Sequence, residues 1–117
     1  MAVLVSPAAA LDIKEDTKGL SHYIMGLYCE DLGDIDRAIQ EYQKALKADP
    51  QSSLLHLNLA SVFIKKNDAV SAIAQLKQSI GLAPDAVEPH AILALVYAAQ
   101  NKPDFAAGEY TLALKNA

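Results

Sequence analysis

The sequence is poor in the residues that interrupt helices and in the residue that cross-links chains. Its 117 residues include only five glycines, five prolines and one cysteine. This scarcity of glycine and proline, with abundant alanine, leucine, lysine, glutamine and glutamate, predicts long helices. Cys29 has no second cysteine to pair with. An intramolecular disulfide is therefore excluded, and the fold has to be stable without one.

Long hydrophobic runs are lacking as well. No uncharged apolar stretch reaches the roughly 18–20 residues that span a bilayer, so we expect a soluble chain without a membrane partner. The first residues, MAVLVSPAAALDIKED, resemble the end of a secretory signal, but no Lys or Arg precedes Lys14. We favour an apolar or flexible arm over residues 1–18, with a signal remnant as the alternative, and a cytoplasmic over a periplasmic or secreted location.

Positive charge and catalytic motifs are scarce too. The chain has 10 Lys and Arg against 14 Asp and Glu, a formal net charge of −4, and no stretch of sequence gathers its cations. Nucleic acid is not expected as a partner, because neutralising phosphates needs a basic surface. A Gly-rich phosphate loop, paired carboxylates flanking a cleft and a nucleophile–His–acid arrangement are also missing. We therefore predict no enzyme activity, no catalytic residue and no cofactor.

The sequence does contain a pattern that recurs every 34 residues. Small residues occupy two of its positions and mostly large apolar residues two others: Gly26, Ala60 and Ala94 with Ala38, Ala72 and Ala106, and then Cys29, Phe63 and Tyr97 with Tyr42, Leu76 and Tyr110. A pair of antiparallel helices accounts for both sets. The small residues let the two helices approach closely, and the large ones fill the space between one pair and the next.

Turn signals recur in the same phase. Gly33-Asp34, Asn67-Asp68 and Asn101-Lys102-Pro103 follow each first helix, and Pro50 and Pro84 follow the second helices. Glycine and asparagine tolerate left-handed turns, and proline cannot continue a helix. The sequence therefore predicts six helices, near residues 20–32, 35–48, 53–66, 69–82, 88–100 and 103–116.

These registers resemble three tandem tetratricopeptide repeats, at about residues 19–52, 53–86 and 87–117. The resemblance implies an all-α fold, a right-handed α-solenoid of three helix-turn-helix hairpins forming one domain over residues 19–117. It also implies a protein–protein interaction module, with another protein or peptide as partner. The sequence departs from the family where a bulky aromatic usually begins the first helix, because it has His22, His56 and His90 there.

Three histidines in register invite a metal hypothesis, since imidazole is a common metal ligand. Equivalent residues on successive hairpins lie about 8–10 Å apart, whereas zinc ligands lie about 2 Å from the metal, so we predict no metal site. We expect the histidines to pack against neighbouring helices in place of the aromatics. A fold whose stability depends on pH is the alternative, and it requires stability to change between about pH 5.5 and 7.5.

The first helix of each pair is expected to line a concave groove. The predicted groove residues are those that remain after the core positions are removed: Tyr23, Leu27, Leu57, Asn58, Ser61, Ile64, Glu88, Ile92 and Leu95. A row of apolar residues facing water predicts a partner that covers it. Asn58 could pair with the backbone of a bound helix or extended segment. The alternatives are that some of these residues lie in the core, that the arm Met1–Leu11 covers them, or that Asn58 is merely solvated.

One branch of the family grips the acidic C-terminal tail of heat-shock chaperones through a clamp of Lys, Asn and Arg. At the clamp positions this sequence has Tyr23 and Leu27 in the first repeat and Glu88 and Ile92 in the third, and only Asn58 matches. Without the cations, charge-assisted hydrogen bonds to the tail are lost. We therefore expect no binding of such tails.

The last repeat carries apolar residues in positions that would pack on a following element, namely Tyr97, Tyr110 and Leu114. Their exposure would favour association. The alternative function is therefore a self-associating scaffold, a homo-oligomer that pairs through its uncapped ends, or a fragment of a longer repeat array.

Overall fold

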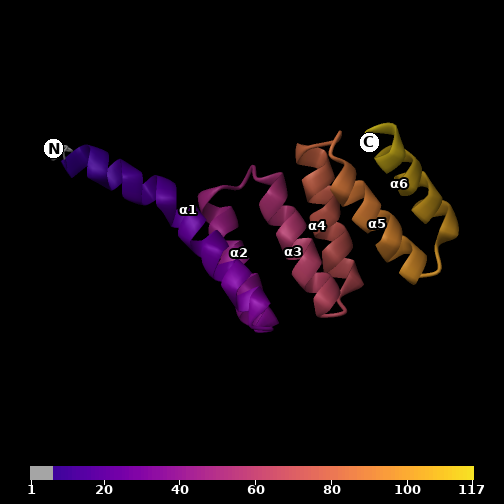
Figure 1. Cartoon of the computed structure of the whole chain (residues 1–117), viewed down its shortest axis with the longest axis horizontal. Coiled ribbons are helices and arrows are strands. Elements are labelled where there is room, and N and C mark those ends of the chain that lie inside the picture. The colour runs from indigo at the N-terminus through magenta and orange to yellow at the C-terminus, as the bar shows by residue number, and fades with distance from the viewer. Residues whose placement is uncertain (1–6) are drawn as a thin grey trace. The chain divides into compact units, whose positions relative to one another are not determined.

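The structure is a computed structural model that describes residues 7–117, with side chains from Thr17 onward. All the regular elements in this range are helices, and Figure 1 shows them as successive hairpins. The helices are α1 (Pro7–Asp31), α2 (Ile35–Ala48), α3 (Ser53–Lys65), α4 (Ala69–Leu82), α5 (Val87–Ala99) and α6 (Pro103–Lys115). The predicted all-α helical-repeat fold is confirmed, and five of the six helices begin within one residue of their predicted starts.

The helix ends explain why these segments stop and start where they do. The residue after each first helix's last turn has a positive φ in all three hairpins: 79° at Gly33, 63° at Asn67 and 58° at Asn101. Glycine and asparagine adopt this left-handed conformation most readily. The next residue then caps the second helix in two hairpins, because Asp34 accepts from the Arg37 N–H and Asp68 from the Ser71 N–H.

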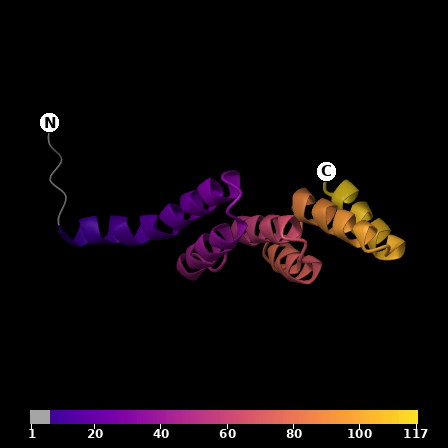
Figure 2. The same cartoon turned by 90° about the horizontal axis from the view of Figure 1, so that it is seen from below.

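α1 is longer than predicted. The sequence placed its start near residue 20, but the helix begins at Pro7, so residues 7–18 of the expected arm are helical (Figures 1 and 2). Proline suits the first turn of a helix, and the following PAAALDIKEDTK is rich in strong helix formers. Residues 1–6 of the arm lie outside the described residues, and the arm's docking stays a prediction.

The chain divides into two compact units, residues 1–50 and 51–117, and the first consists of α1 and α2. The close contact between these helices depends on Gly26, because a Cβ built there would lie 2.5 Å from the ring of Tyr42. Tyr42 is fully buried, and its hydroxyl donates to Glu30 Oε1 at 2.7 Å. Cys29 is buried too, as a helix-packing residue should be.

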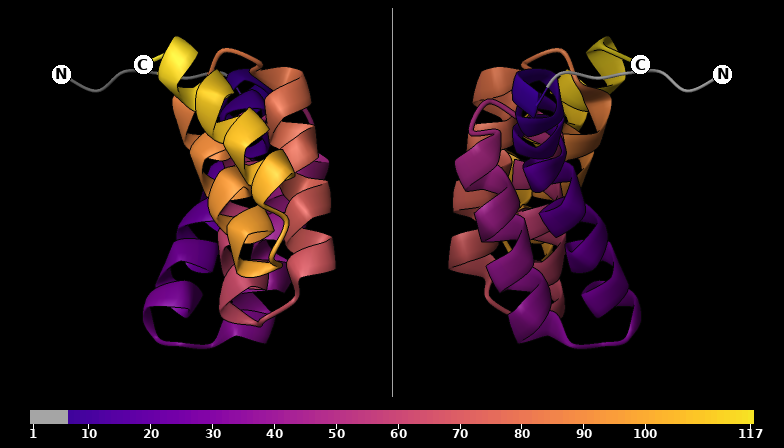
Figure 3. Two further views of the ribbon diagram at one scale, coloured as in Figure 1. Left: turned by 90° about the vertical axis from the view of Figure 1, so that its right-hand side faces the viewer. Right: turned by 90° about the vertical axis from the view of Figure 1, so that its left-hand side faces the viewer.

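The second unit contains α3 to α6, and its core explains why two hairpins pack together. Leu93 and Val96 of α5 form a buried cluster with Ala60 of α3 and Leu76 of α4. α5 therefore covers the face that α3 and α4 present. In the left panel of Figure 3, α6 lies beside α5 and nearest to the viewer. No helix between residues 7 and 117 has the length and hydropathy needed to cross a membrane.

Candidate binding surfaces

Three of the predicted groove residues meet in one pocket of the second unit. Ile64 from the end of α3 and Ile92 and Leu95 from α5 line a cavity of about 340 Å³, called here the α3–α5 pocket; its other lining residues are Asn67, Ala69, Val96, Ala99 and Gln100. The lining is mostly apolar, yet Leu95 is 70% exposed and Ile64 is 40% exposed. Large apolar side chains gathered at a concave and open surface are typical of a binding site.

Four further predicted groove residues lie elsewhere in this unit. Leu57 packs against the core cluster and is half-buried, as the alternative of a core position predicted. Ser61 is half-buried, and Glu88 is exposed in the first turn of α5. Asn58 is half-buried rather than solvated, and its Nδ2 has no hydrogen-bond partner among the described residues. None of the four lines the α3–α5 pocket.

The remaining two, Tyr23 and Leu27, belong to the first unit. Tyr23 is half-buried, and its ring centroid lies 6.2 Å from that of Tyr42, so it contributes to packing between α1 and α2. Leu27 is exposed. A groove that includes these two residues stays a prediction.

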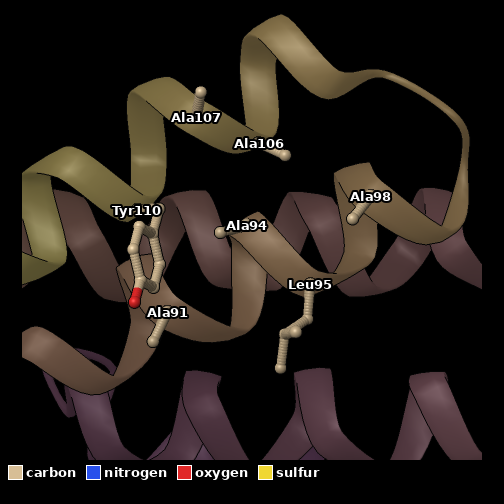
Figure 4. Close-up of a pocket in the computed structure, with 7 residues that line it drawn as sticks. All are labelled: Ala91, Ala94, Leu95, Ala98, Ala106, Ala107 and Tyr110. Atoms are coloured by element: carbon tan, nitrogen blue, oxygen red, sulfur yellow. The ribbon is translucent and has the colours of Figure 1, made fainter.

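A second apolar pocket lies on α5 and α6 and is shown in Figure 4. It has a volume of about 380 Å³, is called here the α5–α6 pocket, and is lined by Ala91, Ala94, Leu95, Ala98, Ala106, Ala107 and Tyr110. The ring of Tyr110 lies beside Ala91, while Leu95 points away from α6. Leu95 lines both this pocket and the α3–α5 pocket.

The three residues predicted for self-association have different surroundings. Tyr110 and Leu114 are exposed on α6. Tyr97 is half-buried, because it packs against the core cluster, and its ring centroid lies 5.4 Å from that of Phe105. Two of the three side chains are therefore accessible.

The first unit holds a pocket that the sequence did not reveal. Lys18 and His22 of α1 and Lys44, Lys47 and Ala48 of α2 line a cavity of about 530 Å³. The 34-residue repeat pattern does not reveal this cluster, because its lysines come from two different helices. Lys44 Nζ lies 3.7 Å from Glu41 Oε1, so part of the positive charge is neutralised locally.

The three histidines are held by hydrogen bonds, which a prediction of packing alone had missed. Each Nδ1 lies 2.7 Å from a side-chain oxygen of the residue 19 positions later: His22 bonds Glu41, His56 bonds Gln75 and His90 bonds Glu109. Glu41, Gln75 and Glu109 are themselves 34 residues apart, so the repeat contained the signal. Each pair ties the first helix of its hairpin to the second.

These bonds also change proton affinities. The hydrogen bond from His22 lowers the pKa of Glu41, against the opposing effect of burial and with help from the charge of Lys44. Burial alone would lower the pKa of His90, but its bonds to Glu109 and to the Pro84 carbonyl, with the charge of Glu109, raise it. Within residues 17–117, no group of three or more His, Cys, Asp or Glu side chains is arranged to hold a metal ion.

Repeated hairpins with one conserved internal register define a helical-repeat protein. Residues 31–96 match the tetratricopeptide repeat model, more than half of the chain. The chain therefore belongs to the tetratricopeptide repeat family, as the sequence predicted.

Similar proteins agree with this assignment. Anaphase-promoting complex subunit 3 of Schizosaccharomyces pombe is 30% identical over 89 residues, which is 76% of this chain but only 13% of that protein. The crystal structure of MamA matches with a TM-score of 0.83 and 20% identity, over 86% of this chain and 58% of that one. The second repeat domain of Spaghetti (RPAP3), bound to the HSP90 peptide SRMEEVD, has a TM-score of 0.81 and 21% identity, over 89% and 96% of the two chains.

Proposed function

We propose that the chain is a binding module that holds an apolar segment of another protein in the α3–α5 pocket. The family fold is a protein–protein interaction module, which supports this class of function. The observation that carries the proposal is the exposure of Leu95 and Ile64 beside Ile92 at a cavity of about 340 Å³. Such a cavity is large enough for one or two apolar side chains of a ligand.

An unsatisfied amide oxygen at the pocket indicates what else the ligand offers. Gln100 lines the pocket with a buried Oε1 that has no hydrogen-bond partner in the described structure, and Asn58 has an unpartnered Nδ2. A buried polar atom without a partner costs about 1–3 kcal/mol. A peptide backbone carries an N–H donor, so an extended segment or the frayed end of a helix in the pocket could satisfy the Gln100 oxygen after a small side-chain rotation. Asn58 does not line the pocket, and its pairing with a ligand backbone stays a prediction.

The lining of the two apolar pockets and the net charge of the chain argue against several other partners and activities. The α3–α5 and α5–α6 pockets are lined by no titratable side chain that could act as a general acid or base apart from Tyr110. A net charge of −4 disfavours nucleic acid. We infer that binding at the α3–α5 pocket involves no catalysis, cofactor, nucleic acid or membrane.

We also infer that acidic chaperone tails are not the ligand. The clamp positions Leu27 and Glu88 are exposed but carry no positive charge, and Tyr23 is half-buried against Tyr42. Glu88 would repel a tail carboxylate, and an apolar pocket offers it no charge-assisted bond.

The test compares the intact chain with Ile64→Glu and with Val70→Glu in affinity capture from the source cell, read by mass spectrometry. Val70 is a matched control, because it is an exposed aliphatic residue on α4 that lines neither pocket. We expect partners on the intact chain and on Val70→Glu, and their loss from Ile64→Glu. Equal melting temperatures would show that all three chains are folded.

A second variant tests the amide. Gln100→Ala should weaken capture without lowering the melting temperature, because Gln100 lines the α3–α5 pocket and its Oε1 has no hydrogen-bond partner among the described residues. The same proteins on all the variants would contradict the proposed site.

A further inference from the structure

The packing of α5 inside the second unit shows how this chain covers one hairpin with the next helix. Leu93 and Val96 of α5 are buried against Ala60 and Leu76, with Leu57 and Ile73 packed around them. α5 thus inserts two apolar side chains into the face formed by α3 and α4. An equivalent contact on the next hairpin would place two apolar side chains of another helix in the face formed by α5 and α6.

The equivalent face of α5 and α6 has the same register but lacks a cover in the second unit. Residues 34 positions after Leu57, Ala60, Ile73 and Leu76 are Ala91, Ala94, Ala107 and Tyr110, and all four line the α5–α6 pocket (Figure 4). Leu57 and Ile73 are both replaced by alanine at this face. The smaller side chains leave the hollow of about 380 Å³.

α1 carries the counterpart of the inserted side chains. Residues 68 positions before Leu93 and Val96 are Met25 and Tyr28, which are 39% and 59% exposed. Their α3 equivalents, Leu59 and Val62, are buried. Two positions that are buried in α3 and α5 are therefore exposed in α1.

The sizes of the two exposed surfaces are complementary. The α5–α6 pocket has alanine at two positions where α3 and α4 have large aliphatic residues. At the inserting position, Tyr28 of α1 is larger than the equivalent Val96 of α5. The residues lining the α5–α6 pocket are uncharged, as are Ile24, Met25 and Tyr28. Joining them buries apolar surface without burying an unpaired charge.

We propose that α1 of one molecule docks in the α5–α6 pocket of a second copy, with Met25 and Tyr28 entering the hollow. The contact is head to tail, so a dimer keeps one free α1 and one free α5–α6 pocket, and further copies can add. This association goes beyond the proposed partner binding and uses Tyr28 and Ala107, which lie outside the α3–α5 pocket. Leu95 lines both pockets and is therefore not used in either test.

The experiment is sedimentation velocity on the intact chain, on Tyr28→Glu and on Ala107→Glu, from about 1 μM to about 1 mM, the range of weak specific association. Both substituted residues are exposed, so the variants should fold, and circular dichroism melts check this. We expect the mean mass of the intact chain to rise with concentration. Each variant alone should associate at least about tenfold more weakly.

Mixing the two variants gives the decisive result. Tyr28→Glu retains a sound α5–α6 pocket and Ala107→Glu retains a sound α1, so an equimolar mixture should form dimers and nothing larger. Val70→Glu and Ile64→Glu should assemble like the intact chain, which separates this contact from the α3–α5 pocket.

Three results would overturn the proposal. The first is an intact chain that stays monomeric throughout the concentration range. The second is a single variant that still dimerises, which would indicate a symmetric contact. The third is a mixture of folded variants that stays monomeric while the intact chain assembles.

Discussion

Replacement of His90 by phenylalanine should make the stability of the protein less dependent on pH. His90 is only 4% exposed, and both of its ring nitrogens face acceptors: Nδ1 lies 2.7 Å from Glu109 Oε2 and Nε2 lies 3.0 Å from the Pro84 carbonyl oxygen. A neutral imidazole carries one N–H and can donate only one of these bonds. The ring that satisfies both acceptors is the imidazolium, with the Glu109 carboxylate as its counter-ion.

The size of the effect follows from these two bonds. A hydrogen bond to a charged group contributes about 1.5–3 kcal/mol and a neutral one about 0.5–1.5 kcal/mol. Glu109 keeps a side-chain exposure of 22%, so water replaces part of the lost bond, and the phenyl ring retains the apolar packing. We therefore expect His90→Phe to lower the free energy of unfolding by roughly 2 kcal/mol near pH 6.

The sign of the pH dependence follows from the raised pKa of His90 in the folded chain. The folded state holds the proton more tightly than the unfolded state, whose histidine pKa is about 6.5. This stabilisation is complete below about pH 6.5 and is lost as the pH rises through the folded pKa. The difference in stability between the intact chain and His90→Phe should therefore shrink between about pH 6 and pH 9.

Urea unfolding followed by circular dichroism at several pH values measures this difference, and the ring ¹⁵N shifts of His90 report its protonation directly. His56→Phe is the matched control, because the His56 bond of 2.7 Å goes to the neutral amide of Gln75. The loss of stability in that variant is the reference for removing a histidine hydrogen bond to an uncharged partner. A difference between the intact chain and His90→Phe that is constant from pH 6 to pH 9 would refute the imidazolium assignment.

Two further predictions concern helix packing and ligand choice. Gly26→Ala should destabilise the fold by about 1–3 kcal/mol in urea unfolding, because its Cβ would lie 2.5 Å from the Tyr42 ring. A Cβ at Gly108 would meet nothing within 4 Å, so Gly108→Ala should stabilise the fold by about 0.5–1 kcal/mol. Equal effects of the two substitutions would show that the predicted close contact is wrong. The peptide SRMEEVD should give no signal in titration calorimetry at about 100 μM, and binding that is lost in Lys44→Glu would instead assign acidic ligands to the lysine-lined pocket of the first unit.

Much of the fold could be predicted from the sequence because each 34-residue repeat contains its own turn residues. Gly33, Asn67 and Asn101 share one position and one left-handed conformation, so the turns could be placed almost to the residue. The start of α1 could not, because no strong stop precedes residue 20 and helix propensity alone extends the helix to Pro7.

The candidate site was harder to predict, because the burial of residues on one helix face also changes along the length of the helix. Ile64, Ile92 and Leu95 were predicted for the groove and line the α3–α5 pocket, whereas Leu57, seven residues before Ile64, packs on the core. The histidine partners could have been found by applying the same step to Glu41. The lysine-lined pocket could not, because only the pairing of α1 with α2 brings its residues together.

The double role of Leu95 has a thermodynamic consequence. One side chain forms a wall of two pockets, and it adopts one rotamer at a time. Any molecule that fills one pocket and selects a Leu95 rotamer changes the free energy of filling the other. Linkage requires the effect to be reciprocal, so a ligand that strengthens assembly is itself bound more tightly by the assembled chain, and one that weakens assembly is bound less tightly. The concentration of the protein would then act as an effector of its own ligand binding.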